Sequence, residues 1–304
     1  MKLRLARRAG GPLPSVAAVT MVRDEGRMLP KWIDHYGAQL GLDNLVVVDD
    51  SSEDGSTDDL PCSVLRLPPA YKKDFEPTRM GVLSGLAATL LEVHDAVLFS
   101  DADEFVVADP AKHESLRHFV AARRDREAVG VLGLNVIHHL AAEGPLDFGR
   151  PFLEQRRLAK FVPLMCKPAL KTVPAPWAAA SHGIRTDFAI DPELYMFHFK
   201  FADRDHLRAA AEHRKAMVEM DGRAAVTSWS QGGDALVDLL EEMNADLSAD
   251  PGDQAEFRPP PRKRLGEIVE RTPQGVVRAT GVRQMLAMQR RPALRIPERF
   301  RSTV

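Results

Sequence analysis

Three acidic side chains, Asp101, Asp103 and Glu104, stand between two apolar runs of the chain, 96–99 and 105–107. Carboxylates two residues apart in an extended segment point to the same side of the chain. Asp101 and Asp103 can therefore share one divalent cation, and Mg²⁺ and Mn²⁺ prefer such oxygen ligands. A solvated acidic turn is the alternative. The buried character expected of the preceding run favours the metal site.

A second group of polar residues follows the apolar run 45–48. Asp49 and Asp50 can accept hydrogen bonds from a nucleotide base or a ribose hydroxyl. An Asp- and Ser-rich turn that caps a helix has the same composition, and taken alone it is the commoner explanation. Glu25 either orders a loop above a sheet or lies at the start of a helix, where negative charge complements the helix dipole.

Two histidines, His182 and His198, lie in the second half of the chain. Either can complete an octahedral metal site or contact a pyrophosphate, although a lone histidine is more often structural. Lys200 comes two residues after His198, so the two side chains share one face of an expected strand. A histidine and a lysine on one face suit a diphosphate leaving group.

The elements that must position these residues alternate between strands and helices. Apolar, β-rich runs predict strands at 15–22, 44–52, 62–68, 95–105 and 128–140. Helical spacing predicts helices at 24–40, 78–94 and 113–126. This alternation predicts an α/β fold with a mostly parallel sheet flanked by helices. Such sheets bind ligands at the carboxyl ends of their strands, where the polar groups described above fall.

The second half is expected to contain a strand at 193–203 and helices at 203–220 and 234–247, with a further short helix at 280–291. We expect a flexible basic arm over 1–14 and a main domain over 15–222. That domain divides into a nucleotide-binding half, 15–140, and an acceptor half, 141–222. A helical, basic C-terminal extension over 223–304 follows, with a linker near 248–262.

Charge is unevenly spread along the 304 residues, whose net charge is −2. Residues 258–304 contain 12 Lys and Arg against 3 Asp and Glu. This basic tail could contact an anionic membrane surface, a nucleic acid or an acidic glycan. A solvated or packing appendage is the more frequent outcome, and the scarcity of aromatic residues argues against nucleic acid.

Other features of the sequence bear on the cellular compartment in which the protein is expected. No apolar run approaches the roughly 18–20 residues of a membrane helix, and the N-terminal stretch lacks the apolar core of a secretory signal. Cys62 and Cys166 are far apart and form no disulfide framework. We therefore expect a cytoplasmic protein, and a peripheral contact of its basic tail with the inner face of the membrane stays open.

Taken together, several stretches resemble glycosyltransferase family 2-like proteins, in the branch related to family 92, formerly a domain of unknown function. Arg23-Asp24-Glu25 stands at that branch's K-N-E pattern, and 31–36 at its E-W-I-x-H-H pattern. Residues 49–55 match D-N-x-S-x-D-G, and 101–105 match D-x-D-E-F. Landmarks downstream are "MCKPALK", "SHG" and "HFKF". The resemblance covers about residues 15–205, and the joint spacing is more specific than any single motif.

The resemblance implies a GT-A fold, in which the D-x-D motif holds Mn²⁺ or Mg²⁺ against the diphosphate of a nucleotide-sugar, preferably a UDP-sugar. Asp101 and Asp103 match the metal motif, and His198 matches a late histidine that reaches the metal or the diphosphate. The positions that match donor-binding ones are Asp49, with Asp50 beside it, Glu25, and Arg23 in place of the usual lysine. Asp24 replaces the usual asparagine.

The expected reaction is the transfer of a sugar to a saccharide or another hydroxyl acceptor, as in polysaccharide biosynthesis. Lys200, Lys167 and Arg79 can add positive charge at the leaving diphosphate. An acceptor hydroxyl also needs a carboxylate base within reach. No residue matches the base of the well-understood members, which leaves Asp187, Asp191 and Glu104 as candidates.

Two other functions remain open from the sequence. One is a non-catalytic protein of the same fold that binds a nucleotide-sugar or a glycan. The other is a phosphohydrolase with Asp101 as its nucleophile, although Phe105 stands where such enzymes usually have Thr or Val.

Overall fold

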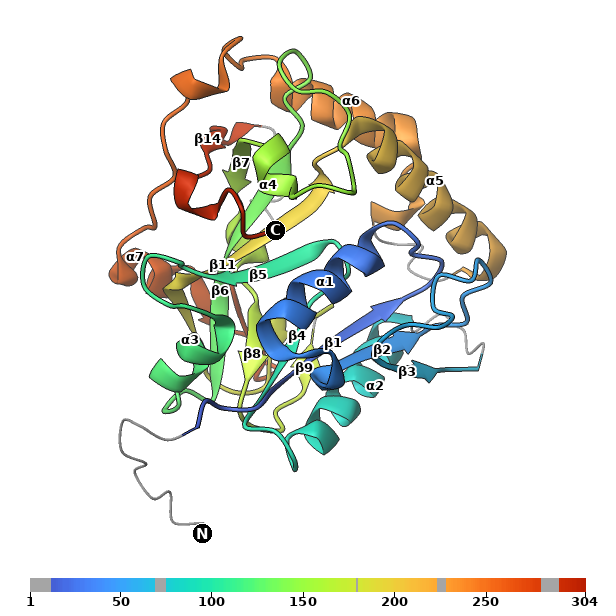
Figure 1. Cartoon of the computed structure of the whole chain (residues 1–304), viewed down its shortest axis with the longest axis vertical. Helices are drawn as coiled ribbons and strands as arrows, with labels where there is room; N and C mark the ends of the chain where they lie inside the picture. Colours follow the sequence, from blue (N-terminus) through green and yellow to red (C-terminus); the bar gives the residue numbers. More distant parts are fainter. Residues whose placement is uncertain (1–11, 69–74, 179, 223–227, 280–289) are drawn as a thin grey trace.

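The computed structural model describes residues 12–68, 75–178, 180–222, 228–279 and 290–304, and shows an α/β fold. Its main sheet contains ten strands within those residues, in the order β14-β7-β6-β8-β4-β1-β2-β3, with β11 paired to both β5 and β6 (Figure 1). The α/β class predicted from the alternation of strands and helices is confirmed.

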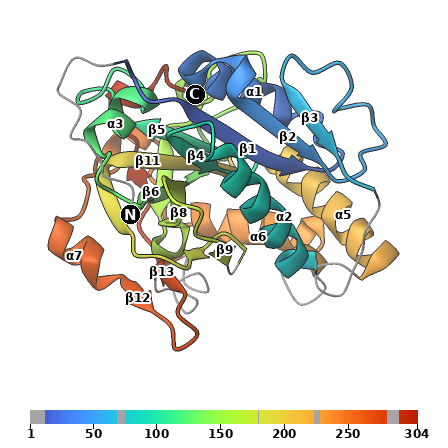
Figure 2. The ribbon, with the colours of Figure 1, turned by 90° about the horizontal axis from the view of Figure 1, so that it is seen from below.

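The N-terminal part of the sheet is parallel. It contains β1 (Val16–Val22), β2 (Leu45–Asp49), β3 (Ser63–Arg66) and β4 (Ala96–Phe99). The helices α1 (Met28–Leu40) and α2 (Phe75–Leu90) lie on opposite faces of these strands (Figure 2). Burial on both faces explains why β1, β2 and β4 are apolar runs rather than alternating patterns.

The other part of the sheet is mixed. Its long central strand, β11 (Ala189–Phe201), runs parallel to β6 (Ala128–Ile137) and antiparallel to β5 (Glu104–Ala108). β6 also pairs antiparallel with β7 (Leu158–Phe161) and β8 (Pro168–Lys171), and β8 joins the two parts through β4. The predicted parallel order therefore holds for the first part, and the Pro-rich region 150–200 adds antiparallel strands.

The glycines in β6 allow a close approach. A Cβ atom on Gly133 would lie 2.4 Å from the backbone carbonyl carbon of Met165. Met165 ends the 3₁₀ helix η2 (Pro163–Met165), which is packed against the strand. Gly133 thus lets the segment after β7 lie directly against the sheet.

A short additional sheet lies beside the main one, and Figure 2 shows it below β8. Its strands come from two distant parts of the chain: β9 (Trp177–Ala178), β10 (Gly183–Ile184), β12 (Val269–Arg271) and β13 (Val277–Ala279). The remaining helices are α3 (Leu116–Ala122), α4 (Phe152–Gln155), α5 (Arg204–Asp221), α6 (Gly233–Asn244) and α7 (Arg262–Glu267). In the part of the chain that the structure describes, the other 3₁₀ turns are η1 (Leu42–Asn44), η3 (Ser228–Ser230), η4 (Pro251–Asp253) and η6 (Glu298–Phe300).

The region expected as a helical, basic extension contains strands as well as helices. Its strand β14 (Leu294–Arg295) pairs with β7 in the main sheet. Phe300 is buried against Tyr195 of β11, and the carbonyl oxygen of Thr303 lies 3.1 Å from Nδ1 of His35 in α1. The segment is thus packed into the main fold. Most of the helix expected at 280–291, and residues 1–11 of the expected arm, lie outside the described residues.

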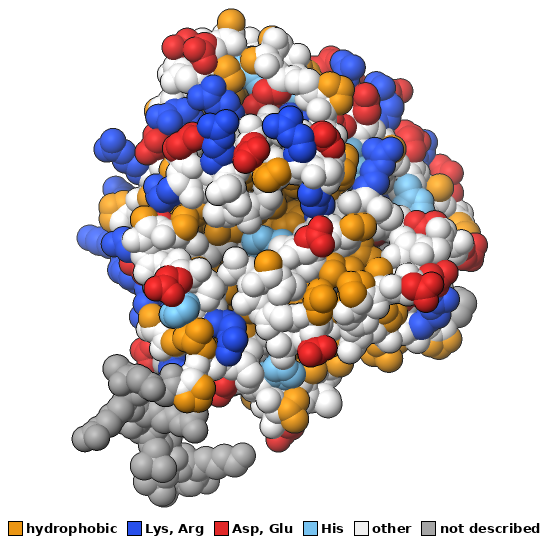
Figure 3. Space-filling view, viewed as in Figure 1, with side chains coloured by type: hydrophobic (Ala, Val, Ile, Leu, Met, Phe, Trp, Pro, Cys, Tyr) orange, Lys and Arg blue, Asp and Glu red, His pale blue; other side chains and the backbone are white. Residues whose placement is uncertain are grey.

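Basic residues of this segment are paired with acidic ones. Arg299 binds both carboxylate oxygens of Asp109, and Arg295 lies 3.2 Å from Glu256. Figure 3 shows Lys and Arg side chains interspersed with Asp and Glu over the region of α4 and β14. Within the described residues, no helix combines the length and apolar character that crossing a membrane requires.

Candidate active site

A cavity of about 1110 Å³ opens where β1, β2 and β4 reach their carboxyl ends. Its walls include residues 21–27 at the end of β1 and beyond it, Asp50 and Asp54 after β2, and residues 101–104 after β4. The opposite walls come from α2, from β11 and from α5. The place predicted from the strand order is therefore the place where a large cavity lies.

Asp101 faces positive side chains. It forms an ion pair with Arg79 of α2, and its Oδ2 lies 3.7 Å from Nζ of Lys167. Burial acts to raise the pKa of Asp101, but Arg79 and Lys167 outweigh it and hold the pKa below its ordinary value. Arg79 and Lys167, which were predicted to bind the diphosphate, thus lie against Asp101, which was predicted to bind the metal.

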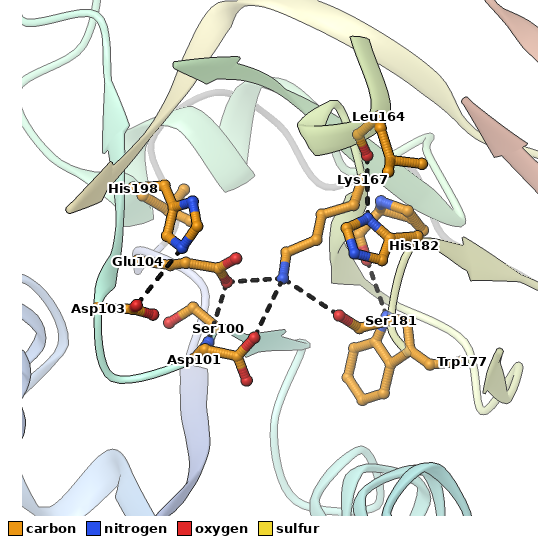
Figure 4. A network of polar contacts seen from close by, with 12 residues as sticks. Ser100, Asp101, Asp103, Glu104, Leu164, Lys167, Trp177, Ser181, His182 and His198 are labelled. Carbon is orange, nitrogen blue, oxygen red and sulfur yellow. Dashed lines mark hydrogen bonds and ion pairs between the residues drawn. The ribbon is translucent and has the colours of Figure 1, made fainter. Parts of the chain in front are cut away.

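Glu104 lies on the cavity wall and forms a buried pair with Lys167 (Figure 4). Lys167 Nζ lies 2.6 Å from Glu104 Oε2 and donates a hydrogen bond of 3.1 Å to Oγ of Ser181. Burial acts to lower the pKa of Lys167, but the carboxylates of Glu104 and Asp101 keep it above its ordinary value. Glu104 also accepts the backbone N–H of Asp101 at 3.0 Å, so it shapes the turn between β4 and β5.

Asp103 lies among three positive or potentially positive side chains. Its Oδ2 is 3.4 Å from Nε2 of His198 and 3.7 Å from Nη2 of Arg214. Burial opposes ionisation, but His198, Arg214 and Lys200 together hold the pKa of Asp103 far below its ordinary value. Asp103 is therefore ionised, and cations surround it.

Lys200 lines the same part of the cavity, two residues after His198 on β11. Its burial, with the nearby charge of Arg214, lowers its pKa to about 8. His198 and Lys200, which were predicted to share a strand face, both line the cavity.

The residues after β1 and β2 are tied together. Asp24, which has a positive φ of 52°, accepts the backbone N–H groups of Glu53 and Asp54 through Oδ1. Its other oxygen, Oδ2, lies 3.7 Å from Nε of Arg23. Both loops therefore form one wall of the cavity, and Arg23 is part of that wall.

Glu25 lines the cavity and also begins α1. Its Oε1 accepts the backbone N–H of Met28 at 3.1 Å, which satisfies one free donor of the first helical turn. Burial raises the pKa of Glu25, and the negative charge of Asp103 acts in the same direction. Of the two explanations that the sequence left open, the contact with Met28 supports the place at the start of the helix, while Asp24 is the residue that ties the loops together.

Asp49 and Asp50 differ in place. Asp49 is fully buried and does not line the cavity, because its carboxylate accepts from Ser52 N–H, Thr57 Oγ1 and Arg66 Nε. Asp50 lies on the cavity wall. Of the two aspartates predicted to bind the donor, Asp50 is therefore the one that can reach a ligand in the cavity. Asp49 stabilises the turn that follows β2.

The structure does not bring Asp187 and Asp191 to the cavity. Asp187 is exposed and pairs with Arg271 at 2.6 Å. Asp191 is buried at the other end of β11, where it pairs with Nε of Arg123 at 2.6 Å. Neither lines the cavity, so neither can reach an acceptor bound there.

His182 lines the cavity but donates from Nδ1 to the carbonyl oxygen of Leu164 at 3.0 Å. Burial, together with the charge of Lys167, lowers its pKa to about 4, so the ring is neutral. Its neighbours Ala180 and Ser181 have positive φ angles of 54° and 67°, and the hydrogen bond from Lys167 to Ser181 holds this unusual backbone in place.

Sequence reasoning missed the cavity residues of α5 and β6. His206, Ala210, His213, Arg214 and Met217 lie along one face of α5 and line the cavity. Their helical spacing was a readable signal, because residues three and four apart share a helix face. Asn135 of β6 also lines the cavity. Nothing in the sequence indicates this role, because Asn135 is a single polar residue in an apolar run.

The candidate metal ligands on the cavity wall match only part of what a divalent cation requires. Within the described residues, no group of three or more His, Cys, Asp and Glu side chains is arranged to hold a metal. Asp103 and His198 nevertheless present a carboxylate oxygen and an imidazole nitrogen 3.4 Å apart on the cavity wall. A carboxylate with an imidazole fits Mn²⁺ better than Mg²⁺, which prefers oxygen ligands alone. Asp101 is turned toward Arg79 and Lys167 instead.

Comparison with known proteins adds little to this geometry. No protein-family model matches the chain, and no curated protein matches it. The chain shows a weak likeness to a solved mannosyltransferase, PcManGT from Pyrobaculum calidifontis in complex with GDP-Man and Mn²⁺. The two are 17% identical, the TM-score is 0.24, and the match covers 47% of this chain and 40% of that one.

A second weak likeness is to a mannose-1-phosphate geranyltransferase from Thermus thermophilus. The identity is 12%, the TM-score is 0.28, and the match covers 77% of this chain and 66% of that one. The chain thus spans less than two thirds of the length of either structure. Both likenesses are too distant to carry an argument, so the function must be argued from the cavity itself.

Proposed function

We propose that the chain is a metal-dependent glycosyltransferase of GT-A type, which moves a sugar from a nucleoside diphosphate to a hydroxyl acceptor. The observation that supports this most is the cavity at the carboxyl ends of β1, β2 and β4, with cations gathered around Asp103 on one wall. A cavity of this size accommodates a nucleotide-sugar, and its polar groups converge on one region.

The cations suit a leaving diphosphate. Arg214 and Lys200 line the cavity beside Asp103, and their combined charge exceeds that of the one carboxylate between them. Asp103 and His198 would hold the divalent cation, which would neutralise charge on the diphosphate when bound. Arg79 lies next along the wall, where it already balances Asp101.

The other wall suits the remaining parts of the donor and the acceptor. Asp50 can accept hydrogen bonds from the base or the ribose. Glu25 is the carboxylate that we assign to the acceptor's proton, because it lines the cavity and its raised pKa makes it a stronger base than an ordinary glutamate. It replaces Asp187, Asp191 and the ion-paired Glu104 in this role.

Nucleotide binding tests the proposal. Thermal shift with UDP and GDP, each with and without Mn²⁺, should show stabilisation that depends on the metal. Asp103→Ala should abolish the gain that Mn²⁺ brings. The matched control is Asp187→Ala, which removes an exposed carboxylate outside the cavity and should bind as the wild type does. Nucleotide binding that ignores both Mn²⁺ and Asp103→Ala would overturn the proposal.

Donor turnover separates the enzyme from the alternatives. A panel of UDP- and GDP-sugars should reveal slow hydrolysis of one donor in the absence of an acceptor, with release of the free sugar. Metal-dependent binding without any turnover would support a non-catalytic binding protein. Release of inorganic phosphate from phosphate esters would support a phosphohydrolase.

A further inference from the structure

One part of the cavity wall is uncharged and has no role in the proposed donor site. It is formed by the C-terminal part of α5, the turn η3 and the first half of α6. Its described residues are Met217, Trp229, Ser230, Gln231, Leu236 and Leu239. None of these side chains ionises at neutral pH, whereas the walls around Asp103 and Asp50 are rich in charge. This part of the cavity therefore suits an uncharged group of a ligand.

Trp229 has the largest ring of this uncharged wall. It is half-buried, whereas the other two tryptophans of the chain, Trp32 and Trp177, are 0% and 3% exposed. The indole is a large, flat and mostly apolar surface. On a cavity wall, the part of it that stays open offers that surface to a ligand.

Neighbouring elements hold Trp229 in place. From the start of α2, Phe75 packs against it, with ring centroids 5.6 Å apart and ring planes tilted by 55°. Just after Trp229, the backbone N–H of Gly233 donates to the carboxylate of Glu212 in α5. A Cβ atom on Gly233 would lie 2.8 Å from the carbonyl oxygen of Arg208, so a larger residue would push this segment away from α5. A ligand therefore meets a wall that is already formed, which lowers the cost of binding.

Two uncharged hydrogen-bonding side chains follow Trp229. Ser230 and Gln231 are exposed, and both line the cavity. A hydroxyl and an amide each donate and accept hydrogen bonds. A pyranose ring presents the matching surface, because it has an apolar face of C–H groups and an edge of hydroxyl groups. A hydrocarbon chain would match the indole but not the two polar side chains beside it.

The uncharged wall borders the place that we propose for the diphosphate. Phe75, which packs against Trp229, lies four residues before Arg79 in α2, and residues four apart share one face of a helix. Arg79 in turn pairs with Asp101 at the end of β4. A group bound on Trp229 would therefore lie next to the charged wall, where a sugar acceptor has to be.

We infer that Trp229, Ser230 and Gln231 form the acceptor subsite, and that the acceptor is a saccharide whose pyranose ring stacks on the indole. Ser230 and Gln231 bind the hydroxyl groups at the edge of that ring. The inference rests on the proposed function for the role of the saccharide as acceptor. The binding of a saccharide depends only on the uncharged wall.

Tryptophan fluorescence tests the subsite without a donor or a metal. A ligand in the cavity should change the emission of Trp229, because Trp32 and Trp177 are buried and do not line the cavity. The probes are cellobiose, maltose, lactose, mannobiose and chitobiose. We expect at least one of them to shift or quench the emission of the wild type, and we expect no such change in Trp229→Phe.

Calorimetric titration with the responding saccharide gives the second readout. Trp229→Leu should bind it about tenfold more weakly than the wild type, because the stacking contact is lost, and Trp229→Phe should lose less. Gln231→Ala should weaken binding by about threefold to tenfold. This second variant changes an exposed side chain, so it keeps the test open if Trp229→Leu does not fold. The control is Glu241→Ala, at an exposed residue of α6 outside the cavity, which should bind as the wild type does.

No response to any of the saccharides, or equal affinities of the wild type and Trp229→Leu, would overturn the inference. A response of Trp229 to uridine or to dodecanol in place of the saccharides would also overturn it, in favour of a nucleobase or a hydrocarbon chain. A protein that binds a saccharide at Trp229 but turns over no donor would overturn the proposed function and leave the subsite standing. Donor turnover without any saccharide response would do the reverse.

Discussion

Lys167 Nζ lies 2.6 Å from Oε2 of Glu104, and the two side chains are 1% and 2% exposed. The glutamate begins β5, while the lysine precedes β8, 63 positions later in the chain. Their pairing joins the turn that carries Asp101 and Asp103 to the segment that carries Ser181 and His182. This buried ion pair therefore connects two segments that contribute to the cavity wall.

Removing one partner of this pair should destabilise the protein strongly. Lys167→Met leaves Glu104 buried without its counter-charge, and we expect a loss of about 3–5 kcal/mol in the free energy of unfolding. The double variant Lys167→Met, Glu104→Leu should lose less than the two single variants together, because no charge is left unpaired. Urea denaturation measures each value. Lys112→Met, at an exposed lysine, serves as the control.

Glu25→Gln tests the proposed base. Because glutamine keeps the shape and the acceptor oxygen for Met28 N–H, donor binding should change little. Turnover should fall by about 10²–10⁴-fold, the usual contribution of a general base. Steady-state kinetics with the donor found above separate the two effects. The control is Glu92→Gln, at an exposed glutamate, which should behave like the wild type. If Glu25→Gln changes only the KM for the donor, Glu25 acts in binding and not as the base.

Arg214→Gln tests the cations of α5. Loss of a charge-assisted contact with the diphosphate should weaken UDP binding by about tenfold or more, with a smaller dependence of the affinity on salt. Calorimetry at two salt concentrations measures both quantities. The matched control is Arg208→Gln, which removes a half-exposed arginine of the same helix that pairs with Asp234 and does not line the cavity. Equal affinities in the two variants would contradict a role for Arg214.

Asp191→Asn should change stability without changing activity. The variant loses the charge that binds Arg123, and we expect a cost of about 1–3 kcal/mol in the free energy of unfolding. Transfer should stay at the wild-type rate, because Asp191 lies outside the cavity. Asp187→Asn should leave both properties unchanged, since that side chain is exposed. If either variant is fully folded and yet loses turnover, the substituted aspartate is again a candidate for the base.

Lys171 predicts a dependence of stability on pH. Burial lowers its pKa in the folded protein to about 8, whereas a lysine of the unfolded chain has a pKa of about 10.4. Between these values the unfolded chain holds more protons than the folded one. This group therefore makes the free energy of unfolding rise with pH across that window, by at most about 1.4 kcal/mol per pH unit.

The comparison with Lys171→Met isolates this contribution. Below about pH 8 the difference in stability between the two proteins should be constant, and above it the wild type should gain relative to the variant. Urea denaturation between about pH 7 and pH 10 measures the difference. Because Lys171 Nζ lies over the ring of Trp177 at 3.6 Å, Trp fluorescence can follow the transition. A difference that does not vary with pH would contradict the lowered pKa.

The first part of the sheet was predictable from the sequence, because buried parallel strands are uninterrupted apolar runs. β5 was not predicted as a strand of its own. Its first residue is a buried glutamate, whose counter-charge on Lys167 lies far along the chain. The strands β7 to β10, which lie in the Pro-rich region, were missed because each has only two to four residues and depends on partners elsewhere in the chain.

The candidate site, too, was predictable from the sequence only in part. The strand ends correctly indicated the loops of Asp50, Asp101 and Asp103, because carboxyl ends of parallel strands meet at one edge. The sequence could not tell Asp49 from Asp50, since adjacent residues of an extended segment point in opposite directions and both are aspartates. The contact of His198 with Asn135 depends on strand register, which no local pattern encodes.

The packing of Leu294–Val304 also bears on how the protein folds. This segment adds β14 to the main sheet, buries Phe300 against β11 and reaches His35 in the first helix, 268 positions away. Contacts of such long sequence separation form late and slowly. The packing of α1 is therefore complete only when this segment has reached it. Until then the folding chain exposes the apolar surface around Tyr195 and Phe197, and exposed apolar surface of this kind promotes aggregation.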